Sequence, residues 1–343
     1  MTFDVLSAPY LIRLAICILP VLAFLGGLVL LDSFKLAPMR RLIPSLAGGA
    51  AVALVAYLAN TLLLGGHGVP HTTWIETPLM EELLKALVVW LLLRTGRIGF
   101  MVEGAIYGFA VGAGFAMAEN IVYLHYLGPA SLIIWLVRGF GTSLMHGGGT
   151  AIAGILGASQ VHRGKLAREI ALVGGWALAS VLHILYNSPL LPPAFAAGLV
   201  LVGIPALMVA IFMRSERAVE GWLGEGFDSD MQLLADISSG DFSQTPSGVY
   251  LRSLRDSFAP PLVADMLCLL QISTELAIRA KAELLKREAG FSSGQDEDVK
   301  ARLLELLYLE KNIGPTGRLA LAPLLAGRER RLWELRQLGY SSI

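Results

Sequence analysis

Ionisable and amide side chains occur at four places inside long apolar stretches of the sequence. They are Glu81, Glu82 and Lys85 in PLMEELLKALVVW, Glu119 with Asn120 in GFAVGAGFAMAENIVY, His146 in TSLMHGGGTA, and His183 with Asn187 in SVLHILYNSP. Carboxylates can act as general bases, neutral imidazoles can hold a metal, and an amide can donate to an oxyanion. The set therefore predicts activation of a water molecule, either with a divalent metal or by a glutamate alone.

The spacing of the first cluster places its two glutamates in different surroundings. Adjacent positions on a helix point about 100° apart, whereas Glu81 and Lys85 are four residues apart and share a face. One glutamate can then pair with Lys85 while the other faces a separate cavity, and we expect either Glu81 or Glu82 to be the general base. A salt bridge at the membrane interface is the alternative, structural interpretation.

Glycines near Glu119 and His146 predict close contacts between helices. One helix face carries a glycine at every fourth position, namely Gly104, Gly108 and Gly112, and three glycines follow His146 directly. Small residues let membrane helices approach closely, so Glu119 would project into protein rather than lipid. The triplet after His146 would allow either a helix distortion or very close packing. A purely structural hydrogen-bonding role is the alternative for Glu119.

The elements that must position these residues are membrane-spanning helices. Of the 343 residues, 55% are hydrophobic and only 16% are charged, which is more apolar than a soluble domain requires. Seven apolar runs reach the length of about 20 helical residues that crosses a hydrocarbon core; they lie at 9–31, 43–64, 74–95, 101–124, 130–160, 170–186 and 195–213. The runs lack the alternation of barrel strands, so we expect an all-α, polytopic membrane helix bundle of about seven spans.

Basic residues in the short loops predict the orientation of the bundle. They follow the first, third, fifth and seventh runs, as Lys35, Arg40, Arg41, Arg94, Arg97, Arg163, Lys165, Arg168, Arg214 and Arg217. The opposite loops, at 65–73, 125–129 and 188–193, contain no Lys or Arg. The positive-inside rule then predicts an outside N-terminus and a cytoplasmic C-terminal part. In this orientation the polar clusters lie in the outer half of the membrane, with His146 nearer the middle.

The sequence becomes water-facing beyond residue 217. Residues 220–250 are rich in Gly, Asp and Ser and predict a linker or irregular structure, whereas 261–287 and 296–309 carry apolar residues at helical spacing. We therefore divide the chain into a membrane core at 1–217 and a small helical cytoplasmic domain with its linker at 218–343. A docking or stabilising role and a regulatory role both remain open for this domain. With 27 basic and 27 acidic residues, the chain offers no basic field for nucleic acid.

The ordered set of motifs resembles the PrsW family of intramembrane metalloproteases and, more distantly, the type II CAAX prenyl endopeptidases. Four motifs on the third to sixth runs carry the resemblance: Glu-Glu-x-x-Lys at 81–85, Phe-x-x-x-Glu-Asn at 115–120, the isolated His146, and His-x-x-x-Asn at 183–187. The CAAX enzymes usually have His at the place of Glu119 and Arg after the glutamate pair, which favours the PrsW family.

The resemblance implies a role for each site residue. Glu81 or Glu82 would activate water with Lys85 beside them, and Asn187 would assist. Glu119, His146 and His183 would hold a divalent metal, which we expect to be zinc, or the polarised water itself.

We therefore expect an intramembrane endopeptidase that cleaves a membrane-anchored protein near the outer face of the cell membrane. The archetypal substrate of the family is an anti-sigma factor, but the resemblance does not assign a substrate to this chain. Three other functions remain open. They are a transporter or proton relay that uses the same buried groups, a CAAX-type prenyl-protein endopeptidase, and a receptor or scaffold with a degenerate membrane site.

Overall fold

The structure is a computed structural model that describes residues 7–63, 74–127, 130–291, 297–325 and 328–338. Every regular element in these ranges is a helix, which confirms the predicted all-α, polytopic fold. The chain separates into two compact units, Met1–Glu216 and Arg217–Ile343. The loop at 65–73, on which part of the predicted orientation depends, lies outside the described residues.

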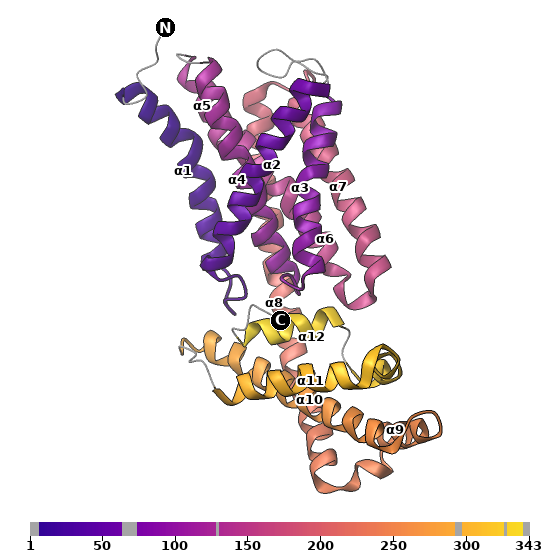
Figure 1. The fold of residues 1–343 in the computed structure, drawn as a ribbon. Helices are drawn as coiled ribbons and strands as arrows, with labels where there is room; N and C mark the ends of the chain where they lie inside the picture. The colour runs from indigo at the N-terminus through magenta and orange to yellow at the C-terminus, as the bar shows by residue number, and fades with distance from the viewer. Residues whose placement is uncertain (1–6, 64–73, 128–129, 292–296, 326–327, 339–343) are drawn as a thin grey trace. The chain divides into compact units, whose positions relative to one another are not determined.

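The first unit is a bundle of helices that lie roughly along one another (Figure 1). Its long helices are α1 (Ala8–Leu30), α2 (Met39–Leu63), α3 (Glu76–Arg94), α4 (Met101–Leu127), α6 (Ser143–Ser159), α7 (Lys165–Asn187) and the first part of α8 (Pro193–Ser239). A short helix α5 (Leu132–Leu136) precedes α6, and a 3₁₀ turn (Val161–Arg163) follows it.

Among the described residues, six helices are long and apolar enough to cross a membrane by length and composition. Five of them, α1, α2, α4, α7 and α8, coincide with predicted spans, and the sixth is α10 (Pro260–Glu288) of the second unit. The predicted third span forms α3. This helix is not among the six, because its charged residues, several of them buried, make it less apolar. The predicted fifth span is divided between α5, a π-helix and α6.

Helix α4 forms the centre of the first unit, and glycines let its neighbours approach closely. A Cβ atom built at Gly104, Gly108 or Gly112 would collide with the backbone of α6, which confirms the predicted glycine contact face. On another face, a Cβ at Gly114 would collide with the backbone of α2 at Leu46. Helix α4 is therefore held at fixed positions between α2 and α6, and α6 carries His146.

The helix distortion near His146 precedes the glycine triplet instead of coinciding with it. A π-helix (Val137–Thr142) joins α5 to α6, whereas the residues after His146 are regular α-helix. The triplet serves close packing: a Cβ at Gly147 would meet the ring of Phe109, and one at Gly148 would meet the side chain of Ile204. The wider i→i+5 hydrogen bonding of the π-helix changes which side chains of this segment face α4.

The predicted linker at 220–250 is wrong for most of its length, because α8 continues as a helix to Ser239. Tertiary contacts within the second unit stabilise this part of α8. The Nζ atom of Lys281 donates to the carbonyl oxygen of Gly226 at 2.8 Å and pairs with Asp230 at 2.5 Å. The rings of Trp222 and Trp333 also meet edge to face. Such packing outweighs the weak helix propensity of glycine and aspartate.

The rest of the second unit is also helical. After α8 come a 3₁₀ turn (Asp241–Gln244), α9 (Pro246–Ser253), a second 3₁₀ turn (Leu254–Asp256), α10 (Pro260–Glu288), α11 (Glu297–Leu321), a third 3₁₀ turn (Ala322–Leu324) and α12 (Arg328–Gln337). Apolar residues of α10 and α11, among them Met266, Leu269 and Leu303, are buried in its core.

Candidate metal centre and active site

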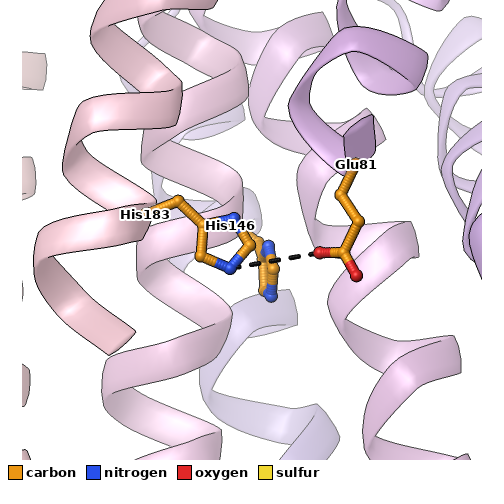
Figure 2. Close-up of side chains that lie close together, drawn as sticks. All are labelled: Glu81, His146 and His183. Atoms are coloured by element: carbon orange, nitrogen blue, oxygen red, sulfur yellow. Dashed lines mark ion pairs between the residues drawn. The ribbon is translucent and has the colours of Figure 1, made fainter. Parts of the chain in front are cut away.

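Helices α3, α4, α6 and α7 bring most of the predicted site residues together. Figure 2 shows Glu81 of α3 and His183 of α7 with their side chains directed toward each other and His146 of α6 beside them. These three residues, with Glu82 and Lys85, are buried, and the exposed fraction of each is 6% or less. Ionisable groups removed from water to this degree need partners among themselves.

Lys85 pairs with Glu82, three residues before it, and not with Glu81 as the shared helix face suggested. The Lys85 Nζ atom lies 2.5 Å from Glu82 Oε1, and both side chains are almost inaccessible to solvent. The Lys85 ammonium also donates to His146 Nδ1 at 2.9 Å and lies 4.4 Å from the centroid of the Phe115 ring. Lys85 therefore compensates the charge of Glu82 and contacts the ring of His146.

Glu82 also fixes the orientation of His183. The His183 Nδ1 atom lies 2.9 Å from Glu82 Oε1, so a neutral imidazole donates its Nδ1–H to the carboxylate. The other ring nitrogen, Nε2, then carries the lone pair and lies 4.0 Å from Glu81 Oε2, as the dashed line in Figure 2 marks. When a histidine binds a metal through one ring nitrogen, its other ring N–H commonly donates to a carboxylate in this way.

His146 contacts groups on both sides of its ring. Because an ammonium group can only donate, Nδ1 accepts from Lys85 and the ring proton lies on Nε2, which is 3.2 Å from Glu119 Oε2. The rings of His146 and His183 meet edge to face, with their centroids 4.7 Å apart. His146 therefore contacts both Glu119 and His183.

The donor set suits a divalent cation. Glu81, His146 and His183 each offer a ligand atom, and these atoms lie within 4.8 Å of one another. His183 Nε2 can bind as it stands. His146 would bind through Nε2, the nitrogen that faces Glu119, with the metal in place of the proton that this nitrogen carries. Two imidazoles with a carboxylate form a donor set typical of catalytic zinc sites.

A cavity with a volume of about 40 Å³ adjoins this cluster, between α2 and α4. Both Glu81 and Glu119 line it, together with apolar residues and the side chains of Tyr57, Asn60 and Tyr123. A volume of this size holds a few water molecules. Of the two adjacent glutamates, Glu81 is therefore the one that faces the predicted separate cavity, whereas Glu82 accepts hydrogen bonds from Lys85 and His183.

Sequence reasoning missed Arg138, which lies in the π-helix. Its guanidinium pairs with Glu119 Oε2 at 3.0 Å, donates to Asn120 Oδ1 at 2.9 Å, and covers the ring of Tyr123 at 3.6 Å. Asn120 in turn donates to the hydroxyl of Ser143 at 3.0 Å. An arginine inside the long apolar run at 130–160 was the available signal.

Asn187 is the one predicted site residue that the structure leaves apart from the others. It is exposed at the end of α7, one helical turn beyond His183. No hydrogen bond connects it to the cluster within the described ranges. The suggested pairing of His183 with Asn187 is not formed, because the His183 Nδ1 atom contacts Glu82.

One of the comparisons with known proteins identifies a family. A family model described as PrsW family intramembrane metalloprotease matches residues 37–214, just over half of the 343-residue chain. No curated protein and no solved structure gives a significant match. The matched segment contains all the residues of the buried cluster. The chain therefore belongs to the PrsW family of intramembrane metalloproteases.

Proposed function

We propose that this intramembrane metalloprotease activates water with Glu81, beside a divalent metal held by Glu119, His146 and His183. The observation that carries the proposal is the convergence of both histidines on Glu81, which lines one cavity together with Glu119, the carboxylate that His146 contacts. A carboxylate and two imidazoles leave a coordination position for substrate or water, as hydrolysis requires. When bound, the metal would polarise the scissile carbonyl and make water a better nucleophile.

Glu81 is better placed than Glu82 to act as general base. Glu82 Oε1 already receives hydrogen bonds from Lys85 and His183, so this carboxylate serves to orient them. The Glu81 carboxylate instead lines the cavity, and its Oε2 atom lies 4.0 Å from His183 Nε2. A water between these two groups would be within hydrogen-bonding reach of the base.

Glu119 supports the ligand set from the other side. Its Oε2 atom lies 3.2 Å from His146 Nε2, a separation that suits two ligands of one tetrahedral ion at bond lengths of about 2.0–2.2 Å. Arg138 keeps this carboxylate in place through its ion pair. Exchange of the roles of Glu81 and Glu119 is the alternative assignment, because Glu81, and not Glu119, offers a ligand atom within 4.8 Å of those of both histidines.

The finer parts of the proposal follow from the donor chemistry and the loop charges. Zinc is the metal that this mixture of imidazole and carboxylate favours. Asn187 would assist from the end of α7 by donating to the substrate carbonyl. The loop charges favour an outside N-terminus and a cytoplasmic location for residues 217–343. The substrate class is a membrane-anchored protein, and a single-span, anti-sigma-factor-like protein is the first to test.

The test is hydrolysis of dye-labelled single-span peptides by the protein in liposomes, with metal content measured on the same samples. Glu81→Gln, Glu119→Gln, His146→Ala and His183→Ala should each lower turnover by at least about 100-fold. Glu81→Gln should keep its metal, whereas the other three variants should lose it. Glu76→Gln, an exposed glutamate on the same helix as Glu81, is the matched control and should match wild type. Wild-type turnover in all four site variants would contradict the proposal.

A further inference from the structure

The cavity beside Glu81 contains a polar residue that the proposed chemistry does not use. Asn60 of α2 lines it opposite the α4 residues, and only 2% of the Asn60 surface is exposed. Its Oδ1 atom is buried and has no hydrogen-bond partner among the residues that the structure describes. A buried acceptor without a donor is unfavourable, so this position favours a ligand that supplies an N–H group.

The rest of the cavity wall restricts what that ligand can be. Apart from Glu81 and Glu119, the other lining residues are mostly apolar, namely Ala53, Leu54, Phe115, Ala118 and Val122, with Tyr57 and Tyr123. Tyr57 hydrogen bonds to Tyr126 of α4 at 3.0 Å, which connects α2 to α4 next to the cavity. Such a wall accepts apolar side chains while offering few partners to a polar backbone.

A protein segment that is to be cleaved presents the matching group. Backbone N–H and C=O groups lose their helical partners when a membrane segment unwinds, and an apolar environment does not replace them. An enzyme that draws such a segment toward Glu81 must therefore provide acceptors for its free N–H groups. Among the described residues that line the cavity, Asn60 is the one amide, and both carboxylates are assigned to the reaction.

We infer that Asn60 is a substrate-binding residue, whose Oδ1 atom accepts a hydrogen bond from a backbone N–H that the unwound substrate segment directs into the α2–α4 cavity. The inference rests on the proposed function and specifies where the substrate backbone lies. It places the substrate on the side of Glu81 that faces α2, and it predicts that α2 contributes to binding although the sequence motifs lie on α3 to α7.

The test compares Asn60→Leu with Thr61→Val in liposomes. Leu has the branching and the number of side-chain heavy atoms of Asn, but it is bulkier and has no acceptor. Thr61 is the neighbour of Asn60 and hydrogen bonds within α2 to the Tyr57 carbonyl oxygen at 2.8 Å. The probe is a dye-labelled single-span peptide with a Gly-Pro break near one end. Asn60→Leu should lower kcat/KM by about 5- to 30-fold, mainly through KM, as the loss of one hydrogen bond implies. Thr61→Val should leave it unchanged.

The stability of Asn60→Leu separates binding from a structural role. Because the Asn60 Oδ1 atom is unpartnered in the free protein, its removal should leave the unfolding temperature unchanged or raise it. Asn60→Ala provides a second variant with the same expected loss of binding. Lowered unfolding temperatures in both variants would overturn the inference. So would an unchanged kcat/KM in both, which is the result expected if Oδ1 binds only a water molecule.

A readout without hydrolysis keeps this inference distinct from the proposed function. Leu54→p-benzoylphenylalanine places a photoreactive group on the cavity wall. Ultraviolet light should crosslink it to the same peptide, and adding Asn60→Leu should reduce the yield. Asn60-dependent crosslinking without cleavage would refute the proposed function and support the cavity as a peptide site. Glu81-dependent cleavage with crosslinking unaffected by Asn60→Leu would support the function and refute this inference.

Discussion

The ion pair between Lys85 and Glu82 should couple these two residues strongly in the folding of the membrane unit. The exposed fractions of the two side chains are 0% and 1%, and their charged atoms lie 2.5 Å apart. Removing one partner of a buried pair leaves an uncompensated charge and costs about 3–5 kcal/mol. Lys85→Met and Glu82→Gln should therefore each lower the free energy of unfolding by about that amount.

The double variant should recover most of the loss. Lys85→Met with Glu82→Gln removes both charges, and the glutamine carbonyl can still accept from His183 Nδ1. We expect a free energy of unfolding within about 1–2 kcal/mol of wild type, hence a coupling energy of at least about 4 kcal/mol. The measurement is reversible unfolding in mixed detergent micelles for all four proteins of the cycle.

Arg302 and Glu305 provide a control with the same three-residue spacing on an exposed helix face. Their charged atoms lie 3.2 Å apart, and their side chains are 36% and 48% exposed. Their coupling energy should be about 0.5 kcal/mol or less. If each single change at the buried pair cost less than about 1 kcal/mol, or if the double variant were as unstable as the sum of the two, the reasoning would be refuted.

Three further substitutions test how the site is held. Gly112→Ala should push α4 and α6 apart, which should lower the free energy of unfolding by about 1–3 kcal/mol and reduce peptide hydrolysis. Gly198→Ala, with open space around the new Cβ atom, should do neither. Equal unfolding curves for the two variants would contradict this. Arg138→Leu should lower hydrolysis about 10- to 100-fold by releasing the carboxylate that it holds, and Arg138→Lys should restore only part of it; full activity of Arg138→Leu would argue against a positioning role. Glu82→Gln should raise the Kd for the metal about 10- to 100-fold, because His183 loses its charged partner; an unchanged Kd by competitive chelator titration would exclude this support.

Much of the fold could be predicted because membrane helices leave strong signals in sequence. Long apolar runs indicate spans whatever their packing, and the glycines at 104, 108 and 112 indicated a contact face that the structure confirms. The buried cluster could be predicted as well, since a charged residue such as Glu82 at membrane depth is costly and therefore marks a site.

The partners within the cluster could not be predicted from spacing. Lys85 is three residues from Glu82 and four from Glu81, and both spacings bring side chains together on a helix. The choice depends on His146 and His183, which come from other helices and contact Lys85 and Glu82. Sequence spacing on one helix contains no information about those contacts.

Two local structures were also beyond sequence reasoning. The π-helix at Val137–Thr142 directs Arg138 toward Glu119, and an apolar run gives no sign of where such a distortion falls. The helical continuation of α8 depends on Lys281 and other distant residues of the second unit. In both cases tertiary contacts decide the local structure.

Metal content tests the central claim most directly. Elemental analysis of the detergent-purified protein should find close to one divalent metal ion per chain in wild type, and the His146→Ala, His183→Ala double variant should lose it. Enzyme that hydrolyses peptides without bound metal would contradict the account and favour activation of water by glutamate alone. A metal retained in full by the double variant would show that these histidines are not its ligands.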